Sequence, residues 1–484
     1  MKRLCILLLI LLAAGCIGSA VAQDKSVTAS PRTAVSLTVY NENLSLIREE
    51  RSIDLQKGMS RVIIPDVPAT IDGTSLHFSS LTNPAAVSVL EQNYQYDLVN
   101  QDKLLQKYLG KEIEFIRLNE ETKKEYTVKG TLLTSYNPGL VAQINGKIEI
   151  NPTGRLVLPS LPEGLILKPQ LEWLVSSSEG GKHNTEISYL AGQLSWSSDY
   201  VVLLNKDDNK LDMTGWVTLQ NHSGTSFNDA SLKLVAGDVN IVQQNLMPRG
   251  GMVKAMAMDQ EQQFKQTDLF EYKLYTLQRH TDLNDNETKQ IELVSGKDVT
   301  AKKMLIYDGL ADQWRYWSNN YDYRSQGSFG QQSNQKVGVF VTFKNDKASG
   351  LGIPLPKGKV RVYKKDEDGK EQFIGENQID HTPKDEELKL YLGNAFDVVG
   401  ERAQTDFKTI SKKTIEETIT IKIRNHKQEA VEVQVYEHPW RWNQWEITQS
   451  SIDYVKIDQS TIRFPVKLAK DEEKVVTYTI RYSW

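Results

Sequence analysis

The amino-acid sequence predicts an all-β, multidomain protein with immunoglobulin-like β-sandwiches and one or two short helices. Along most of the chain, short runs of Val, Ile, Thr and aromatic residues alternate with polar residues, which is the period of a strand with one buried face. Both cysteines, Cys5 and Cys16, lie near the N-terminus. The domains that follow must therefore fold on hydrophobic cores alone, without disulfides.

Local patterns place the individual elements. Alternating strands are expected at 36–40, 113–118, 359–363, 431–436 and 475–482. The sequence DEDG at 366–369 predicts a hairpin turn between two of them, because Asp-Gly tolerates the positive φ that tight turns need. One clear helix is expected at 100–110, capped by Asn100 and ended by Gly110. Residues 254–266 have helix-forming composition but a poor apolar stripe, and we predict a weak helix or a mobile insertion there.

The same patterns divide the chain into regions, in which the part at 111–167 is expected to be a small barrel or meander. The predicted regions are a signal peptide at 1–22, an N-terminal β region at 23–167, a first β-sandwich at 168–310, a flexible polar and aromatic loop at 311–335, and a C-terminal β-sandwich at 336–484.

The N-terminal segment predicts export. Lys2 and Arg3 are followed by an apolar run at 4–14 and by small residues that end at Ala22. These are the features of a secretory signal peptide, and the apolar run is too short to span a bilayer. The sequence LAAGC also resembles a lipobox, in which Cys16 would become a lipid-anchored N-terminus. Either route predicts an extracytoplasmic protein, whether periplasmic, secreted or on the cell surface.

Charge and motif content argue against several classes of function. Acidic residues number 62 against 58 basic ones, and no basic tract suits a nucleic acid. No second long apolar run suits a membrane span in the mature chain. The sequence contains no nucleotide-binding loop, metal-ligand spacing or nucleophile motif. We therefore predict no cofactor, no metal site and no catalytic residue.

Three strands share a design. Asn221, Asn345 and Asn425 each end an alternating run, and each is followed by a polar connection and a further alternating run. Asparagine suits a strand end because its amide bonds to local backbone and because it tolerates left-handed φ. Paired strands of immunoglobulin-like sandwiches are joined in this way, so the pattern indicates similar architecture in the regions that carry it.

These segments also carry a family resemblance. GWVTLQNHSGTSFNDASLKLVAGDVN at 215–240 resembles the signature of DUF 4139, a bacterial family of unknown function, and YLGNAFDVVGER at 391–402 resembles its second signature. Segments at 38–72, 381–388 and 475–484 are similar to other parts of those proteins. The resemblance implies a β-rich extracytoplasmic protein, and some of the relatives are described as mucoidy-inhibitor-like. It supplies no catalytic or binding residues.

Two groups of residues suggest catalysis at first sight. His222 and Ser223 with Asp229 and Asp238 are the components of a hydrolytic triad, but adjacent residues on a turn usually point apart, so we predict a strand connection. The second group could serve a glycosidase, although simple ion pairing, as between Glu401 and Arg402, is the expected role; it consists of His381, Asp385, Glu386, Glu387, Asp397 and Glu401. Oxygen-rich segments at 205–212 and 281–287 lack the spacing of calcium loops and are predicted to be turns.

Clustered aromatic residues are the preferred binding candidates. They occur at 313–323 and 438–447, and the candidates are Trp314, Tyr316, Trp317, Trp440, Trp442 and Trp445. Exposed indole rings bind sugars or protein partners. The alternative is that they close the sandwich core or pack one domain on the next. If 440–442 is a strand, Trp440 and Trp442 share one face.

These observations favour a non-catalytic protein that binds or scaffolds a glycan or protein partner at the bacterial cell envelope. Sandwiches suit the display of recognition loops. The alternative is a carbohydrate-active hydrolase that uses the carboxylates and aromatic residues of the C-terminal domain.

Overall fold

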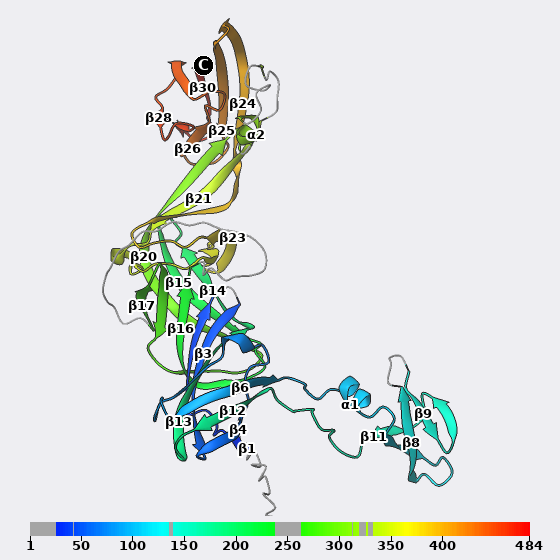
Figure 1. The fold of residues 1–484 in the computed structure, drawn as a ribbon. Coiled ribbons are helices and arrows are strands. Elements are labelled where there is room, and N and C mark those ends of the chain that lie inside the picture. The colour runs from blue at the N-terminus through cyan, green and yellow to red at the C-terminus, as the bar shows by residue number, and fades with distance from the viewer. Residues whose placement is uncertain are drawn as a thin grey trace, which may run out of the picture. The chain divides into compact units, whose positions relative to one another are not determined.

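The structure is a computed structural model that describes residues 26–41, 43–134, 139–237, 263–311, 313–318, 326–327 and 333–484. These residues form a mostly-β fold with several sheets and two short α-helices, which confirms the predicted fold class (Figure 1). Unit 1 comprises Met1–Ser36, Leu46–Ala191 and Ser223–Phe227, and unit 2 comprises Leu37–Ser45, Gly192–His222 and Asn228–Trp484. The predicted signal peptide and Cys16 lie outside the described residues. Within the described ranges no helix is both long enough and apolar enough to cross a membrane.

Two layers of strands form the main body of unit 1. The strands are β1 (Ser26–Thr28), β3 (Leu44–Leu55), β4 (Gly58–Pro65), β5 (His77–Ser80), β6 (Val87–Gln95), β12 (Gln170–Ser177) and β13 (Gly181–Gly192), with the 3-10 turn η1 (Gly73–Ser75). One sheet has the order β1-β4-β12-β6, and β5 pairs with β13 in another. Alternate residues of β12 are buried, and the ring of Trp173 meets that of Phe78 on β5 edge-on at 5.3 Å. Side chains from the two sheets thus share one core.

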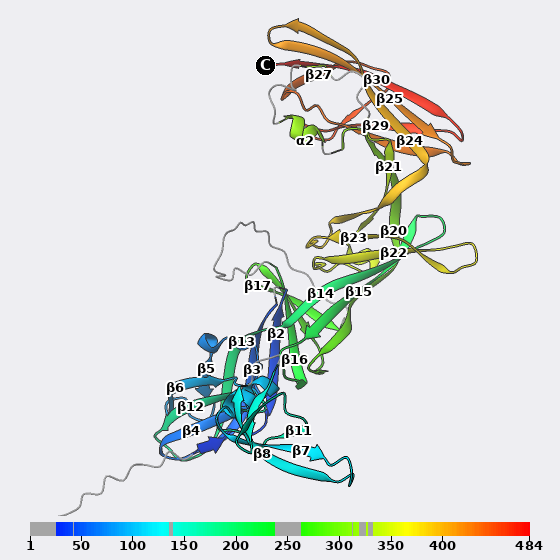
Figure 2. The same ribbon diagram turned by 90° about the vertical axis from the view of Figure 1, so that its right-hand side faces the viewer.

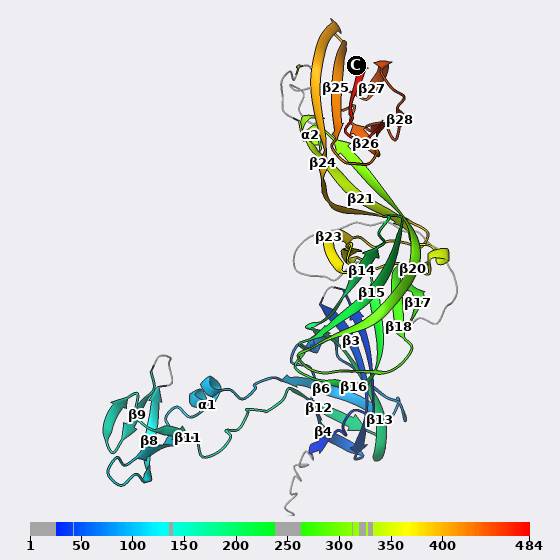
Figure 3. The same cartoon turned by 180° about the vertical axis from the view of Figure 1, so that it is seen from behind.

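A small five-stranded sheet also belongs to unit 1 (Figure 3). Its strands are β7 (Glu112–Leu118), β8 (Glu125–Thr134), β9 (Val141–Ile144), β10 (Lys147–Ile150) and β11 (Arg155–Val157), in the order β10-β9-β8-β7-β11. The helix α1 (Gln101–Lys107) precedes it, and the Asn100 side chain accepts a hydrogen bond from the Lys103 backbone N–H at 2.9 Å. This confirms the predicted helix and its cap. Leu105 of α1 packs into the core of the sheet with Phe115.

Seven strands of unit 2 form a continuous sheet in the order β23-β22-β14-β15-β20-β21-β24 (Figure 2). They are β14 (Leu194–Leu204), β15 (Lys210–Asn221), β20 (Glu287–Asp308), β21 (Lys336–Lys344), β22 (Gly358–Lys365), β23 (Glu371–Ile379) and β24 (Glu387–Ser411). The turn between β22 and β23 contains Gly369 at φ 77°, and Asp366 donates its backbone N–H to the carbonyl of Lys370. The predicted hairpin at 366–369 is confirmed.

Shorter elements complete this part of the chain. They are β2 (Ala34–Tyr40), β16 (Phe227–Ala236), β17 (Phe264–Leu269), β18 (Tyr272–Leu277), β19 (Thr281–Leu283) and the 3-10 turn η2 (Lys347–Ser349). The weak helix or mobile insertion predicted at 254–266 is wrong over its last three residues, which begin β17. Pairing with β18 sets Phe264 opposite Leu277 and buries both, which outweighs local helix preference. Residues 254–262 lie outside the described residues.

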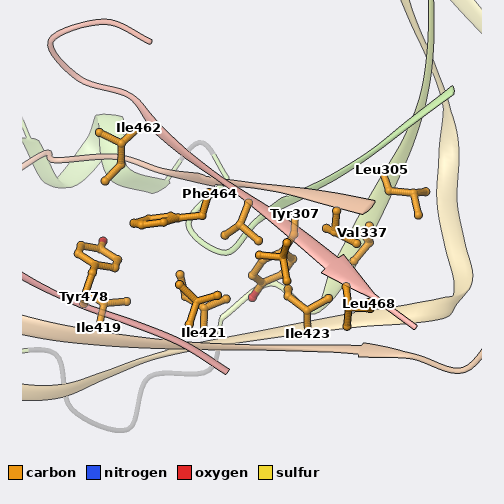
Figure 4. Packing of buried hydrophobic residues seen from close by; sticks show 14 of the residues in the cluster. Leu305, Tyr307, Val337, Ile419, Ile421, Ile423, Ile462, Phe464, Leu468 and Tyr478 are labelled. Carbon is orange, nitrogen blue, oxygen red and sulfur yellow. The ribbon is translucent and has the colours of Figure 1, made fainter. Parts of the chain in front are cut away.

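A sandwich at the C-terminal end of unit 2 is built from six further strands together with β20, β21 and β24. The six are β25 (Thr414–Asn425), β26 (Val431–Glu437), β27 (Gln444–Ser450), β28 (Val455–Lys456), β29 (Ile462–Leu468) and β30 (Glu473–Ser483). One layer runs β24-β25-β30-β27, and the other pairs β26 with β20 and β29. Between them lie isoleucines of β25 and residues of β29 and β30, such as Phe464 and Tyr478 (Figure 4). All five strands predicted from period-two alternation lie inside observed strands.

The three asparagines of the repeated design share one structural role. Asn221 and Asn425 end β15 and β25, Asn345 follows β21, and all three are buried. Each side-chain amide donates to two backbone carbonyls; those bound by Asn221 are adjacent in the chain, whereas the Asn425 amide, for example, lies 2.9 Å from the Glu429 oxygen and 2.8 Å from the Ala469 oxygen. The expected backbone bonding is therefore present. None of the three has positive φ, so the conformational part of that expectation is wrong.

Candidate functional site

The first three aromatic candidates lie on α2 (Gln313–Ser318), which follows β20. Between β20 and α2 the chain turns at residues 308–311. There the Asp308 carboxylate accepts hydrogen bonds from the backbone N–H groups of Leu310 and Ala311 at 3.1 and 2.7 Å. Most of the loop predicted at 311–335 lies outside the described residues, but its start is this helix. Residues three apart share a helix face, so Trp314 and Trp317 project on the same side.

That side of α2 packs on the segment that follows β26. The Trp314 ring stacks on the imidazole of His438, with centroids 4.6 Å apart and planes 13° apart, and Trp317 meets Trp440 at 5.5 Å. Tyr316 instead points outward and is 68% exposed. The candidates of the two aromatic clusters, distant in sequence, are therefore brought together, with two indoles of α2 turned inward and a tyrosine turned outward.

His438 is the polar centre of this contact. Its Nε2 lies 3.1 Å from Asp308 Oδ2, and its Nδ1 lies 3.2 Å from the Ser460 carbonyl oxygen. Both ring nitrogens thus face acceptors, which only the protonated imidazolium can satisfy together. Burial works to lower the pKa of His438, but the hydrogen bond and charge of Asp308 and the Ser460 carbonyl raise it overall. The charged ring also suits a stack on an indole face.

A buried glutamate lies directly before His438. Glu437 ends β26 and accepts from Arg402 Nε at 2.9 and 3.0 Å on its two oxygens, and from the Tyr478 hydroxyl at 2.5 Å. Burial and the Glu437 charge raise the pKa of Tyr478 well above its ordinary value, so this hydroxyl remains a donor. The glutamate therefore ties β24 and β30 to the strand that leads into the aromatic segment.

A second buried pair supports the other end of that segment. Arg441 Nε lies 3.0 Å from Glu417 Oε2, which also accepts from Gln404 Nε2 at 2.5 Å. The guanidinium carbon of Arg441 lies 4.5 Å from the ring centroid of Trp440 and 5.1 Å from that of Phe407. These contacts combine charge pairing with cation–π stacking and fix Trp440 beneath α2.

A cavity of about 30 Å³ lies among these groups. Its lining comes from both charge pairs and both aromatic clusters, and includes Trp317, Arg402, Glu417, Trp440 and Arg441. Such a volume holds one or two water molecules and excludes a sugar ring. The buried carboxylates each hold an arginine, so the interior of the site positions the aromatic segment. The surface that a larger ligand can reach is the outward side of α2.

The last two aromatic candidates lie apart from α2. Residues 438–443 connect β26 to β27, so the strand geometry that would give Trp440 and Trp442 a common face is absent. Trp442 packs on Trp484 at 4.9 Å and against the sandwich core. Trp445 donates its indole N–H to the Gln459 carbonyl at 2.9 Å, and the Lys456 ammonium lies 4.5 Å from its ring centroid. Both indoles are partly buried.

The carboxylates proposed for glycosidase chemistry are spread along β24. Glu387 pairs in register with Lys344 of β21, whereas Glu401 pairs with Lys422 of β25, and roughly 45 Å of strand separates them. Paired glycosidase carboxylates lie about 5–10 Å apart. Glu401 forms an ion pair with Arg424 at 2.6 Å. The expected pairing of Glu401 with its neighbour is wrong, because adjacent residues of a strand point to opposite faces.

Of the remaining members, His381, Asp385 and Glu386 lie in the connection between β23 and β24, and Asp397 lies within β24. Asp385 has φ 68°, its backbone N–H donates to the Asn345 carbonyl at 2.7 Å, and its carboxylate lies 3.8 Å from Lys384. The His381 Nδ1 accepts from the backbone N–H of Lys357 at 3.1 Å. Their positions fit a strand connection.

The residues that resembled a hydrolytic triad do not converge. The His222 ring faces the Asn286 side chain at 3.3 Å, the Ser223 hydroxyl donates to the Thr225 carbonyl at 3.4 Å, and Asp229 pairs with His280 at 3.1 Å. Asp238 lies outside the described residues. The serine and its neighbouring histidine thus point apart, as predicted.

The two oxygen-rich segments form turns. At 205–212 the Asn205 side chain accepts from the backbone N–H groups of Asn209 and Lys210, and at 281–287 the Glu287 carboxylate accepts from Asn284. Their oxygens are used in turn formation and, for Asp208, in ion pairs.

Sequence reasoning missed the buried charges beneath the aromatic cluster. Glu437 shares the strand parity of Val433 and Val435, and Glu417 shares that of the buried isoleucines of β25. A glutamate in register with buried aliphatic residues is a usable signal, since such a group requires a partner.

Compared with models of known protein families, the chain matches none, and it matches no protein of known, curated function.

Proposed function

We propose that this chain is a non-catalytic, extracytoplasmic protein of the bacterial cell envelope that binds a glycan or a protein partner or serves as a scaffold for it. The binding surface in this proposal is the outward side of α2 with the adjoining residues 438–440. The secretory features of residues 1–22 and the resemblance to DUF 4139 support the envelope location.

One observation carries the proposal: α2 is anchored on one side and aromatic on the other. A helix of six residues has little stability of its own. Here Trp314 and Trp317 hold it against a segment that two buried arginine–glutamate pairs support. The anchored helix consequently presents Tyr316 at the surface, where it is 68% exposed. Preorganised aromatic side chains are efficient recognition groups because little entropy is lost when they bind.

The chemistry of the surface suits a ligand with both apolar and hydroxyl-bearing faces. A tyrosine ring can stack on the apolar face of a sugar, and its hydroxyl can hydrogen-bond to the rim. Arg315 lies beside it with its guanidinium carbon 5.4 Å from the Trp314 ring centroid. Tyrosine with arginine is equally a common pair at protein interfaces.

A pull-down with enzymatic readout tests the proposal. The mature chain is incubated with peptidoglycan and with envelope polysaccharides, and both retained protein and released soluble sugar are measured. We expect retention without release, and we expect Tyr316→Ala to weaken retention about tenfold, as loss of an aromatic anchor does.

The matched control is Tyr96→Ala, since Tyr96 is similarly exposed, at 65%, but belongs to unit 1. Retention that survives Tyr316→Ala, or falls equally in both variants, would contradict the assignment of the surface. Release of sugar by the wild-type chain would contradict the non-catalytic proposal and support the hydrolase alternative.

A further inference from the structure

A second cavity of unit 2 is lined by strands of the seven-stranded sheet, is open to solvent on one side and shares no lining residue with the α2 site. The first and last strands of that sheet, β23 and β24, come together. The Asn377 side chain of β23 donates to the Tyr391 carbonyl of β24 at 3.2 Å, and a Cβ at Gly375 would lie 3.1 Å from the Leu392 Cα. The sheet is therefore rolled, and strands from both of its edges contribute residues to the cavity lining.

The lining of this cavity is mainly aliphatic. Leu204 of β14, Val339 and Val341 of β21, Ile374 of β23 and Leu392 of β24 surround it, and its volume is about 160 Å³. Val339 and Val341 lie two apart on one strand and so face the same side. A cavity of this size and lining accommodates a phenyl ring or a branched aliphatic group. Pockets at the open end of a rolled sheet are common ligand sites.

Charged groups define one side of the cavity. Lys303 of β20 and Lys364 of β22 both bind the carboxylate of Asp208, which comes from the turn between β14 and β15. The Lys303 ammonium lies 2.6 Å from Asp208 Oδ2. Strand register places Lys303 beside Val341 and Lys364 beside Leu204, so each ammonium adjoins the aliphatic lining.

The balance of this cluster favours an anion. Two ammonium groups provide six N–H donors, while one carboxylate provides two acceptor oxygens. The three side chains together carry one positive charge. An added carboxylate would find donors and an opposite charge, whereas an added ammonium would meet two like charges. The site is therefore complementary to a molecule that is apolar at one end and anionic at the other.

We propose that this cavity binds a small free monocarboxylate with a phenyl or branched aliphatic body. The body would lie between β14, β21, β23 and β24, and the carboxylate would bind Lys303 and Lys364 beside Asp208. Asp208 then has a defined role, because it neutralises the two lysines when no ligand is bound and competes with the ligand carboxylate for them.

Calorimetric titration of the full mature chain with three matched probes tests this proposal. The probes are phenylacetate, phenylethanol and phenylethylamine, which share the ring and differ in the charge of the head group. We expect phenylacetate to bind at least about tenfold more tightly than the alcohol, as charge-assisted hydrogen bonds imply. Equal binding of all three probes, or no binding of phenylacetate, would overturn the proposal.

Variants separate the two halves of the site. Lys303→Met should weaken phenylacetate binding about tenfold, whereas Lys302→Met, which removes the same charge from the exposed, opposite side of β20, should leave it unchanged. Val339→Phe should abolish binding by filling the cavity; because Val339 also packs against the core of the C-terminal sandwich, its near-ultraviolet circular dichroism is compared with that of the wild type first. Asp208→Asn should strengthen binding several-fold by removing the internal competitor. Unchanged binding in Val339→Phe, with its near-ultraviolet circular dichroism retained, would place the ligand elsewhere and refute the assignment.

Discussion

Both units of the chain bury a glutamate beside arginine, but the two carboxylates are satisfied differently. In unit 2, both oxygens of Glu437 accept hydrogen bonds, from Arg402 and from Tyr478. In unit 1, Glu49 Oε2 accepts from both Arg32 and Arg51, while its Oε1 has no hydrogen-bond partner among the described residues. The carboxylate is therefore fully hydrogen-bonded in unit 2 and only partly hydrogen-bonded in unit 1.

The difference shows which ion organises each core. Glu437 of β26 binds side chains of β24 and β30, so in unit 2 the anion is the hub, the group to which the other side chains bind. In unit 1 the hub is Arg32, which also donates to the backbone carbonyl of Ser226 at 3.1 Å and to that of Asp66. A buried charge is stabilised only as far as its hydrogen bonds are completed. The tolerance of each core to loss of its glutamate should differ accordingly.

The largest effect is expected for Glu437→Gln. The change leaves the largely buried Arg402 without its counter-ion and removes charge-assisted bonds from both oxygens. Breaking a buried ion pair in this way costs about 3–5 kcal/mol of the free energy of unfolding. Urea unfolding followed by hydrogen exchange of β25 and β30 peptides measures it for the C-terminal sandwich. A cost below about 1 kcal/mol, the range of surface pairs, would contradict the hub role.

A smaller effect is expected for Glu49→Gln, about 2–3 kcal/mol measured on unit 1 peptides. Glutamine keeps an acceptor for the arginines at the position of Oε2, and Oε1 has no hydrogen bond to lose. Arg32 also keeps Asp66, at 3.7 Å, and two carbonyl groups, and Arg51 keeps the Ser30 carbonyl at 3.2 Å. If the Glu49 variant proves the less stable of the two, the completeness of hydrogen bonding does not decide the cost.

A neutral link sharpens the comparison further. Asn425→Ala removes the amide that bridges the Glu429 and Ala469 carbonyls. Each carbonyl then loses the hydrogen bond that it accepts from Asn425. Because no charged partner is left unpaired, the free energy of unfolding should fall by only about 1–2 kcal/mol in the same hydrogen-exchange experiment. The exposed Asn443 serves as the control, and Asn443→Ala should change stability little. An Asn425 cost as large as that of Glu437→Gln would show that geometry outweighs charge here.

The sequence carried enough information for the strands and turns but not for their assembly. Period-two alternation located β7, β22, β26 and β30, because burial on one face imposes that period wherever such a strand lies. The lengths of β20 and β24 were not foreseen. Each passes from the rolled sheet into the sandwich. In β20 the change of partner, between Thr300 and Ala301, has no Gly or Pro beside it. In β24 the change follows Gly393, which has φ 118°, but one glycine inside an alternating run does not by itself mark a boundary.

The candidate site shows the same limit. Aromatic composition singled out Trp314 and Trp440, but their union depends on long-range pairing of β20 with β26, which no local pattern encodes. The arginine partners were hidden because charged residues in alternating strands usually face water. Arg402 is different because its strand neighbours Val398 and Gly400 of the same parity are buried.

The smallest effect expected is a pH dependence of the α2 contact. The pKa of His438 is raised in the folded state, chiefly by Asp308, against an ordinary value near 6.5. A raised pKa means that the stabilisation is fully present below about pH 6.5 and is lost as the pH rises through the folded value. Protection of α2 amides, corrected for the intrinsic exchange rate, should therefore fall on the alkaline side. The groups that face the ring are Asp308, Glu437, the Ser460 carbonyl and the Trp314 indole.

His438→Gln isolates this contribution, because every other histidine of unit 2 is unchanged in the variant. Glutamine can still donate to Asp308 but does not titrate, so the profile of the variant should be flat where that of the wild type declines. Parallel profiles would mean that another group controls the contact. If the difference does appear, the contact that holds Tyr316 at the surface is itself tied to the charge of one histidine, and retention on envelope material should weaken over the same alkaline range.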